Sequence, residues 1–246
     1  MTEHQAECMD KRAMGSEDRM PLISAQNVVK DYRDGDTTVH ALRGVDLVLE
    51  EGEFTALAGP SGSGKTTLLN LVGGLDTPTS GEVRIRGEVI SSMHPRQLHG
   101  MRLHHIGFVF QAFNLIPVLS AQENVAFTMQ LQGIPPEECR RRALEVLDQV
   151  GLAAEAGRRP AALSGGQQQR VAVARAIVTR PEIVLADEPT ANLDSETGAD
   201  LLDLMKHLNE EHGITFLFST HDPMVMDYSR RLVRLHDGHI ASEQRT

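Results

Sequence analysis

The chain is poor in aromatic residues and in cysteine. Tryptophan is absent, and aromatic residues make up only 4% of the 246 residues. The two cysteines are Cys8, in a polar stretch near the N-terminus, and Cys139, among apolar residues at helical spacing. This number does not suggest a disulfide framework or a metal site, and it fits a reducing compartment. We expect Cys139 to be a small buried apolar side chain.

Long apolar runs and an excess of basic residues are also absent. No segment approaches the roughly 18 consecutive apolar residues that a membrane span requires, and the charged N-terminus lacks the apolar stretch of a secretory signal. Lys and Arg number 24 against 34 Asp and Glu, so the formal net charge is −10. An acidic chain argues against non-specific nucleic-acid binding. We therefore expect a protein that is soluble by itself and has no nucleic-acid partner.

The pattern along the chain divides it into a tail and one domain. Residues 1–20 are polar and charged without periodicity, which indicates a disordered tail, and residues 21–246 indicate a single domain. Alternating segments early in this domain predict a layer of half-buried antiparallel strands. Short apolar segments then alternate with helical ones, which predicts an α/β fold with a mostly parallel core sheet. The helical stretch at about 112–162 is expected to be an inserted helical subdomain.

Turn and capping residues locate the individual elements. Strands are expected at residues 22–32, 41–59, 81–90, 105–111, 182–188 and 214–222, and helices at residues 66–74, 136–151, 166–179 and 194–213. The strand of residues 105–111 is expected to end at Gln111. Asp194 or Ser195 should cap the last helix, and Gly213 should end it.

The most specific motif is the segment GPSGSGKTT at residues 59–67. It matches the pattern G-x-x-x-x-G-K-[ST] and lies between a predicted strand and a predicted helix, which is the context that this phosphate-binding loop requires. Its glycines let backbone N–H groups surround phosphate oxygens, Lys65 can reach the β- and γ-phosphates, and the Thr66 hydroxyl can ligate Mg²⁺. The residues expected to bind the nucleotide here are Gly59, Pro60, Ser61, Gly62, Ser63, Gly64, Lys65, Thr66 and Thr67.

Polar side chains follow three of the predicted core strands. The apolar run that begins at Ile183 ends in Asp187 and Glu188, at the strand end where ligands bind in such sheets. Asp187 is placed to hold the Mg²⁺ shell, and Glu188 to polarise the attacking water. Gln111 and His221 end two further strands. Either alone is more often a structural cap, but together they could surround a γ-phosphate, with Gln111 near the metal and His221 near the phosphate.

A second anion site is predicted where the segment LSGGQ precedes a helix. A Ser-Gly-Gly turn at a helix start presents free backbone N–H groups and the positive end of the helix dipole. The residues of this segment are Leu163, Ser164, Gly165, Gly166 and Gln167. With the phosphate-binding loop, Gln111, the ANLD segment that ends at Asp194, and His221, it resembles in content and order the nucleotide-binding subunit of an ATP-binding cassette (ABC) transporter. The resemblance covers roughly residues 22–240, and Tyr32 matches the aromatic residue that stacks on adenine in that family.

The resemblance implies a P-loop NTPase fold of the ABC cassette type that binds ATP with Mg²⁺ and hydrolyses it. It implies a dimer with a second ATPase subunit, expected to be an identical copy, in which Ser164 and Gly166 contact the ATP of the partner while Glu188 and His221 act on their own ATP. The implied metal-site residues are Thr66, Gln111 and Asp187. The implied membrane partner is an integral permease, which would hold the subunit on the cytoplasmic, inner face of the membrane.

Several segments favour one branch of this family. GGLDTPTSGEV, IGFVFQAFNLIP, LSGGQQQRVAVARA and LADEPTANLDS resemble the lipoprotein-release and macrolide-export branch, although ANLD differs from the GNLD usual there. FNLIPVLSAQENV is also similar to polar amino-acid importers, which are the alternative. A soluble, non-transporting ABC ATPase is disfavoured, because Lys65 and Ser164 are only 99 positions apart and leave no room for a long coiled coil.

A docking surface for the permease is expected around Gln111 and the helical subdomain. Phe113, Leu115 and Ile116 are candidates to line a groove that receives a helix of the membrane partner. Ordinary packing beneath the loop that follows Gln111 explains these three side chains equally well.

Overall fold

The structure is a computed structural model, and it describes residues 20–35 and 37–245. The tail expected at residues 1–20 therefore lies outside the described residues apart from Met20, and so does Cys8. Within the described ranges, no helix has both the length and the apolar character that crossing a bilayer requires.

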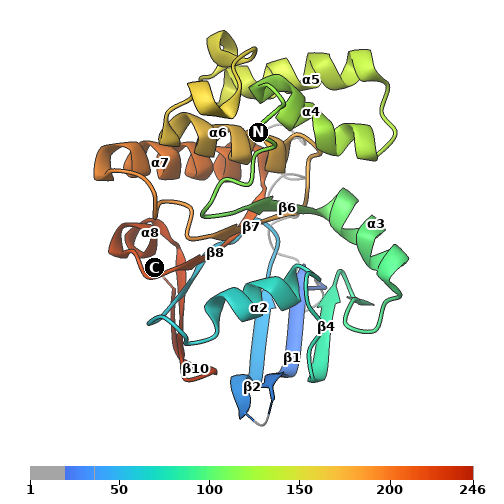
Figure 1. The fold of residues 1–246 in the computed structure, drawn as a ribbon. Coiled ribbons are helices and arrows are strands. Elements are labelled where there is room, and N and C mark those ends of the chain that lie inside the picture. Colours follow the sequence, from blue (N-terminus) through green and yellow to red (C-terminus); the bar gives the residue numbers. More distant parts are fainter. Residues whose placement is uncertain (1–19, 36, 246) are drawn as a thin grey trace, which may run out of the picture.

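The described strands form two sheets (Figure 1). The first has the order β2-β1-β4-β5, and all its pairings are antiparallel. The second has the order β10-β9-β3-β8-β7-β6; its pairings from β9 to β6 are parallel, and β10 is an antiparallel edge. The predicted fold class is therefore confirmed. The strands are β1 Ile23–Asp34, β2 Thr37–Leu49, β3 Phe54–Ala58, β4 Ser80–Ile85, β5 Glu88–Val89, β6 Ile106–Val109, β7 Ile183–Asp187, β8 Thr215–Thr220, β9 Arg231–His236 and β10 His239–Arg245.

Helices cover both faces of the second sheet. Helix α2 packs against strands of both sheets, so it lies between them, whereas α6 and α7 lie on the other face of the second sheet (Figure 1). Helices α4 and α5 pack on α6 and form a further helical layer. The α-helices are α2 Lys65–Val72, α3 Pro95–His105, α4 Ala121–Leu131, α5 Pro136–Gln149, α6 Gly165–Ile177, α7 Ser195–His212 and α8 Pro223–Tyr228, with short 3₁₀ turns at Ala153–Glu155 and Pro160–Ala162.

Three apolar clusters hold these layers together. The first surrounds α2 between the sheets, and the second joins α7 to the opposite face of β3, β7 and β8. The third joins α4 and α5 to one side of α6 and includes Cys139, which is fully buried as expected.

The structure differs from the sequence pattern in several places. β6 ends at Val109, two residues before the predicted end at Gln111, because Phe110 and Gln111 already turn away from β7. Strand β3 is buried on both faces rather than on one, because the cluster around α2 covers one face, with Leu57, and the cluster that includes α7 covers the other, with Phe54 and Ala56. Helix α3 was not predicted: Leu98 is its only buried residue, so its sequence shows no apolar periodicity. The pattern also gave no indication of α8, β9 and β10.

Candidate functional site

The loop of residues 59–67 lies at the carboxyl end of β3 and leads into α2, as its motif requires. Gly59 has a φ of 156°, and a β-carbon there would lie 2.2 Å from the carbonyl oxygen of Leu235. Gly64 has a φ of 104°, and a β-carbon there would lie 2.6 Å from the carbonyl oxygen of Ala41. Only glycine fits such positions, so β9 and β2 fix the curvature that brings the loop N–H groups together.

Lys65 lies inside this loop. Its Nζ donates hydrogen bonds to the carbonyl oxygens of Gly59, at 2.7 Å, and Pro60, at 3.0 Å, and the residue is 7% exposed. These partners are neutral, so they leave the ammonium charge available for an anion. Ser63, also buried here, has a hydroxyl oxygen with no hydrogen-bond partner among the described residues. The loop therefore combines a buried cation with unused hydrogen-bonding capacity.

The Thr66 hydroxyl donates to Oδ1 of Asp187 at 3.0 Å, which joins the loop to the end of β7. The two residues are 121 positions apart in the sequence and present hard oxygen atoms side by side. Mg²⁺ takes such ligands and completes its shell with water and substrate phosphates. No group of three or more His, Cys, Asp or Glu side chains in the described ranges could hold a metal without such help. The donor set fits Mg²⁺ bound together with a phosphate.

Glu188, the next residue, has a left-handed backbone with φ 47°, and its N–H donates to the carbonyl oxygen of Ser219 at 2.8 Å. Non-glycine residues in this conformation are uncommon and gather at functional sites. Its carboxylate accepts a hydrogen bond from the Thr220 hydroxyl at 3.3 Å and lies 2.7 Å from Nδ1 of His221. The Glu188 side chain is 14% exposed and that of His221 66%. A mostly buried carboxylate is thus oriented by an imidazole that solvent or a ligand can reach.

The signature segment at residues 163–167 begins α6. Ser164 caps the helix: its hydroxyl accepts from the Gln167 N–H at 3.2 Å, and the Gln167 side chain accepts from the Ser164 N–H at 3.0 Å. Leu163 anchors the turn in the helical core, while Ser164 is exposed. In the described part of the chain, no hydrogen bond or ion pair connects this segment with residues 59–67. The structure therefore does not bring the two predicted anion sites together within one chain.

The loop that ends at Asp194 supports the signature segment. Asp194 caps α7 by accepting hydrogen bonds from the N–H and the hydroxyl of Thr197, at 2.9 and 2.8 Å, and these bonds lower the pKa of its carboxyl. Thr197 in turn lies against Gly166, where a β-carbon would be 2.3 Å from its Cγ2. The first turns of α6 and α7 are therefore packed closely against each other, and a side chain at Gly166 would require Thr197 to move.

Hydrogen bonds not foreseen from the sequence connect the remaining loops. Asn192 donates from Nδ2 to the carbonyl oxygen of Gln111 at 2.7 Å, and Gln169 donates from Nε2 to that of Pro189 at 2.8 Å. The exposed side chain of Gln111 has no hydrogen bond within the described ranges. In the sequence, only the ANLD motif indicated Asn192. Helical periodicity predicts that Gln169 is buried, but it does not predict its hydrogen bond to Pro189.

Arg175 of α6 holds the loop after Gln111. Its guanidinium donates to the carbonyl oxygens of Phe113, at 2.9 Å, and Asn114, at 2.5 Å, and burial lowers its pKa. Phe113 and Asn114 both have positive φ values, 60° and 50°. A half-buried cation thus stabilises an unfavourable backbone conformation beside Gln111. Nothing in the sequence pattern indicated this contact.

A groove of about 390 Å³ lies between α3, α4, β6 and α6. Ile116 lines this groove, but Phe113 and Leu115 do not; Leu115 packs on the helical core. Leu75, Phe127 and Leu131 line it while being 46%, 36% and 52% exposed. The groove is therefore apolar and accessible, and it adjoins the loop that carries Gln111.

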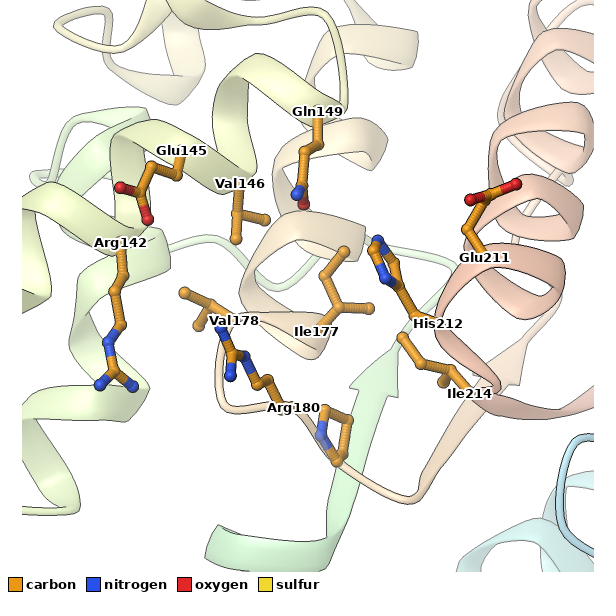
Figure 2. Close-up of a pocket in the computed structure, with 11 residues that line it drawn as sticks. Arg142, Glu145, Val146, Gln149, Ile177, Val178, Arg180, Glu211, His212 and Ile214 are labelled. Carbon is orange, nitrogen blue, oxygen red and sulfur yellow. The ribbon is translucent and has the colours of Figure 1, made fainter. Parts of the chain in front are cut away.

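A larger cavity of about 500 Å³ lies between α5, the end of α6 and the end of α7 (Figure 2). Apolar side chains, among them Val146, Ile177 and Ile214, form part of its wall. The polar side chains of this wall include acidic and basic groups and one glutamine. None of them was predicted as a site residue. They are Arg142, Glu145, Gln149, Arg180, Glu211 and His212.

Comparison with known proteins gives concordant matches. The sequence profile of a family described as ABC transporter matches residues 42–191. The lipoprotein-releasing system ATP-binding protein LolD of Alcanivorax borkumensis is 45% identical over 218 residues, which cover 89% of this chain and 96% of that protein. The macrolide export ATP-binding/permease protein MacB of Syntrophobacter fumaroxidans is 47% identical over 226 residues. That match covers 91% of this chain but only 32% of MacB, so the chain spans about a third of that relative.

Solved structures agree with these matches. A dimeric structure of the ATP-binding cassette MJ0796, in a post-hydrolysis state with ADP and Pi, has a TM-score of 0.85 and 45% sequence identity. The match covers 91% of this chain and 98% of that one. A structure of cbiO1 from Clostridium perfringens, part of the transporter complex cbiONQ, has a TM-score of 0.82 and 29% identity.

Proposed function

The chain belongs to the ABC transporter family, and from that premise we propose that it is the ATP-hydrolysing subunit of a membrane transporter of the lipoprotein-release and macrolide-export type. One observation carries the enzymatic part of this proposal. The Thr66 hydroxyl, the Asp187 carboxylate and the Glu188–His221 pair meet beside the phosphate-binding loop, although they come from distant parts of the chain. This is the group set that phosphoryl transfer to water needs.

Each residue has a distinct part in the proposed reaction. Lys65 exchanges its carbonyl partners for the β- and γ-phosphate oxygens of ATP, and the loop N–H groups hold the same oxygens. Mg²⁺, held by Thr66 and Asp187, supplies charge neutralisation for the phosphates when bound. Glu188 accepts a proton from the attacking water or orients that water. His221 holds the Glu188 carboxylate in place and reaches the γ-phosphate from its exposed side.

The signature segment is proposed to act on the ATP of a second copy. Ser164 is exposed, and among the described residues it makes no hydrogen bond or ion pair with residues 59–67, yet it lies at a helix start, which suits an anion. The dimeric state of the related cassette with ADP and Pi supports this arrangement. An ATP between two chains would stabilise the closed dimer, and hydrolysis would release it.

The groove between α3, α4, β6 and α6 is proposed to receive a cytoplasmic helix of the permease, which would hold the subunit at the inner face of the membrane. Its apolar rim of Leu75, Phe127 and Leu131 suits the apolar face of such a helix. The groove is lined by Arg102 and Arg175 but by no acidic side chain in the described ranges. An acidic residue on the docking helix would complement this charge.

ATP hydrolysis by the purified chain with Mg²⁺ tests the enzymatic part. We expect Lys65→Ala to lose nucleotide affinity and turnover, because the only cation inside the loop is removed. Lys206→Ala is the matched control, because Lys206 is exposed on α7 and does not belong to the loop of residues 59–67. Equal ATP affinity of the wild type and Lys65→Ala would contradict the assignment.

Recovery from native membranes tests the transport part. The Glu188→Gln chain, tagged and loaded with ATP and Mg²⁺, should bring down an integral membrane protein with a large periplasmic domain. A compact permease with a binding protein would instead favour the importer alternative. Recovery of soluble partners alone would contradict the transporter assignment while leaving the ATPase assignment intact.

A further inference from the structure

Lys30 and Tyr32 lie on the same side of β1, because successive residues of a strand point to opposite faces. Lys30 is 9% exposed, unusually little for a lysine. Its Nζ donates to Oδ1 of Asp76 and to the carbonyl oxygen of Thr77, both at 2.7 Å. A buried ammonium is thus neutralised by one carboxylate, which lies in the loop that follows α2.

The same carboxylate holds the tyrosine. The Tyr32 hydroxyl donates to the second oxygen of Asp76, Oδ2, at 2.8 Å. The Nζ of Lys30 lies 4.9 Å from the centroid of the Tyr32 ring, within cation–π range. Asp76 therefore bridges the Lys30 ammonium and the Tyr32 hydroxyl. The ammonium also lies over the Tyr32 ring.

Asp76 is itself fixed to the phosphate-binding helix. Its N–H and that of Leu75 donate to the carbonyl oxygen of Asn70, in α2, at 3.3 and 2.8 Å. The Tyr32 hydroxyl also interacts with the Thr67 side chain in the first turn of that helix. The tyrosine is therefore tied to the helix that follows the phosphate-binding loop.

The protonation states suit this arrangement. Burial by itself raises the pKa of Asp76, but hydrogen bonds from Lys30 and Tyr32 outweigh burial and hold the pKa below its usual value. Burial and then the Asp76 carboxylate raise the pKa of the Tyr32 phenol. At neutral pH the carboxylate is charged and the phenol remains a donor.

We propose that Asp76 and Lys30 are positioning residues that hold the Tyr32 ring beside the phosphate-binding helix, so that its exposed part receives the adenine of ATP. This inference rests on the proposed function. Tyr32 is 40% exposed, and a tyrosine so placed would otherwise sample several orientations. If the ring is fixed before the nucleotide binds, part of the entropic cost of ordering it is removed from the binding step. Loss of Asp76 or Lys30 should therefore lower the affinity for the adenine base and leave the rate of the chemical step unchanged.

Isothermal calorimetry with two probes distinguishes contacts to the base from contacts to the phosphates. ATP and inorganic tripolyphosphate, each with Mg²⁺, are titrated into the full chain. Tyr32→Phe keeps the ring and removes only the hydroxyl that contacts Asp76 and Thr67, and Asp76→Asn removes the charge that binds Lys30. We expect each to weaken ATP binding about three- to ten-fold, the loss of one hydrogen bond, without changing tripolyphosphate binding. Asp31→Asn, the same change on β1 at a carboxylate that faces His40, should change neither.

A double-mutant cycle distinguishes positioning from a structural role. Tyr32→Ala should weaken ATP binding about ten-fold or more, because stacking on the base is lost, and adding Asp76→Asn should then have no further effect. The proposal is overturned if Asp76→Asn weakens both probes equally, or weakens ATP as much in the Tyr32→Ala background.

The same data test the proposed function separately. If Tyr32→Ala weakens ATP binding but Tyr32→Phe and Asp76→Asn do not, the positioning role is overturned and the nucleotide site stands. If the wild-type chain binds neither probe, the proposed function is overturned together with this inference.

Discussion

The side-chain amide of Asn192 donates a 2.7 Å hydrogen bond to the main-chain carbonyl of Gln111, 81 positions earlier in the sequence. This bond joins the loop after β7 to the loop after β6, and Arg175 holds the next residues of the second loop from α6. The groove proposed for the permease adjoins these same residues. Hydrogen bonds therefore connect the loop beside this groove with the loop after β7 and with the last turn of α6.

The catalytic role of Glu188 is tested by Glu188→Gln. We expect at least a 100-fold loss of turnover, because the amide cannot accept a proton from water, with ATP binding retained. Phosphate release and calorimetry measure the two effects. The control Glu182→Gln makes the same change at the opposite end of β7, where the carboxylate pairs with Arg86. Near-normal turnover in Glu188→Gln would exclude this residue as the base.

The signature segment is predicted to act in trans, which Ser164→Arg tests. We expect the variant monomer to bind ATP normally and the ATP-dependent dimer of the Glu188→Gln background to be lost, because a large cation would fill the partner's phosphate site. Size-exclusion chromatography with light scattering measures the dimer. Ser242→Arg, the same change at an exposed position of the edge strand β10, should leave it intact. Dimerisation of the Ser164→Arg chain would refute the role in trans.

The contact between Gly166 and Thr197 should be a stability determinant. Gly166→Ala places a β-carbon 2.3 Å from Cγ2 of Thr197, and we expect a loss of about 1–3 kcal/mol in the free energy of unfolding. Gly165→Ala is the matched control, because its β-carbon would meet no atom closer than 3.6 Å. Denaturant unfolding measures both.

A second substitution identifies the cause. Thr197→Ser removes the methyl group and keeps the hydroxyl that donates a hydrogen bond to Asp194. It should therefore restore most of the stability lost in Gly166→Ala. If Thr197→Ser restores nothing, the clash is not the cause of the loss.

The docking groove is tested by Leu131→Glu. A charge at this exposed position on its rim should abolish co-purification with the permease while leaving the ATPase rate of the isolated chain within about two-fold, since the residue lies outside the nucleotide site. Leu144→Glu is the matched control: Leu144 is 43% exposed on α5 and does not line the groove. Equal recovery of the permease with both variants would place the docking surface elsewhere.

The backbone conformation of much of the candidate site was predictable because the motifs are continuous in the sequence. The phosphate-binding loop, the acidic end of β7 and the capped start of α6 each consist of neighbouring residues whose backbone conformation follows from their own residue types. Helix α7 shows the same: Asp194 caps it and Gly213, with φ 66°, ends it, as expected. Local chemistry is sufficient where the partners are a few positions apart.

Contacts between distant segments were not predictable in this way. The bonds of Tyr32 to Asp76, Arg175 to Phe113 and Asn192 to Gln111 join residues 44, 62 and 81 positions apart. No periodicity or motif specifies such pairs, because they depend on how the sheet order and the helical layer place one loop over another. The sequence by itself determined which groups can handle a nucleoside triphosphate. Only the tertiary structure decided which loops hold those groups in place, because this depends on packing between elements. For the same reason, only the tertiary structure shows that no hydrogen bond or ion pair among the described residues joins the signature segment to residues 59–67.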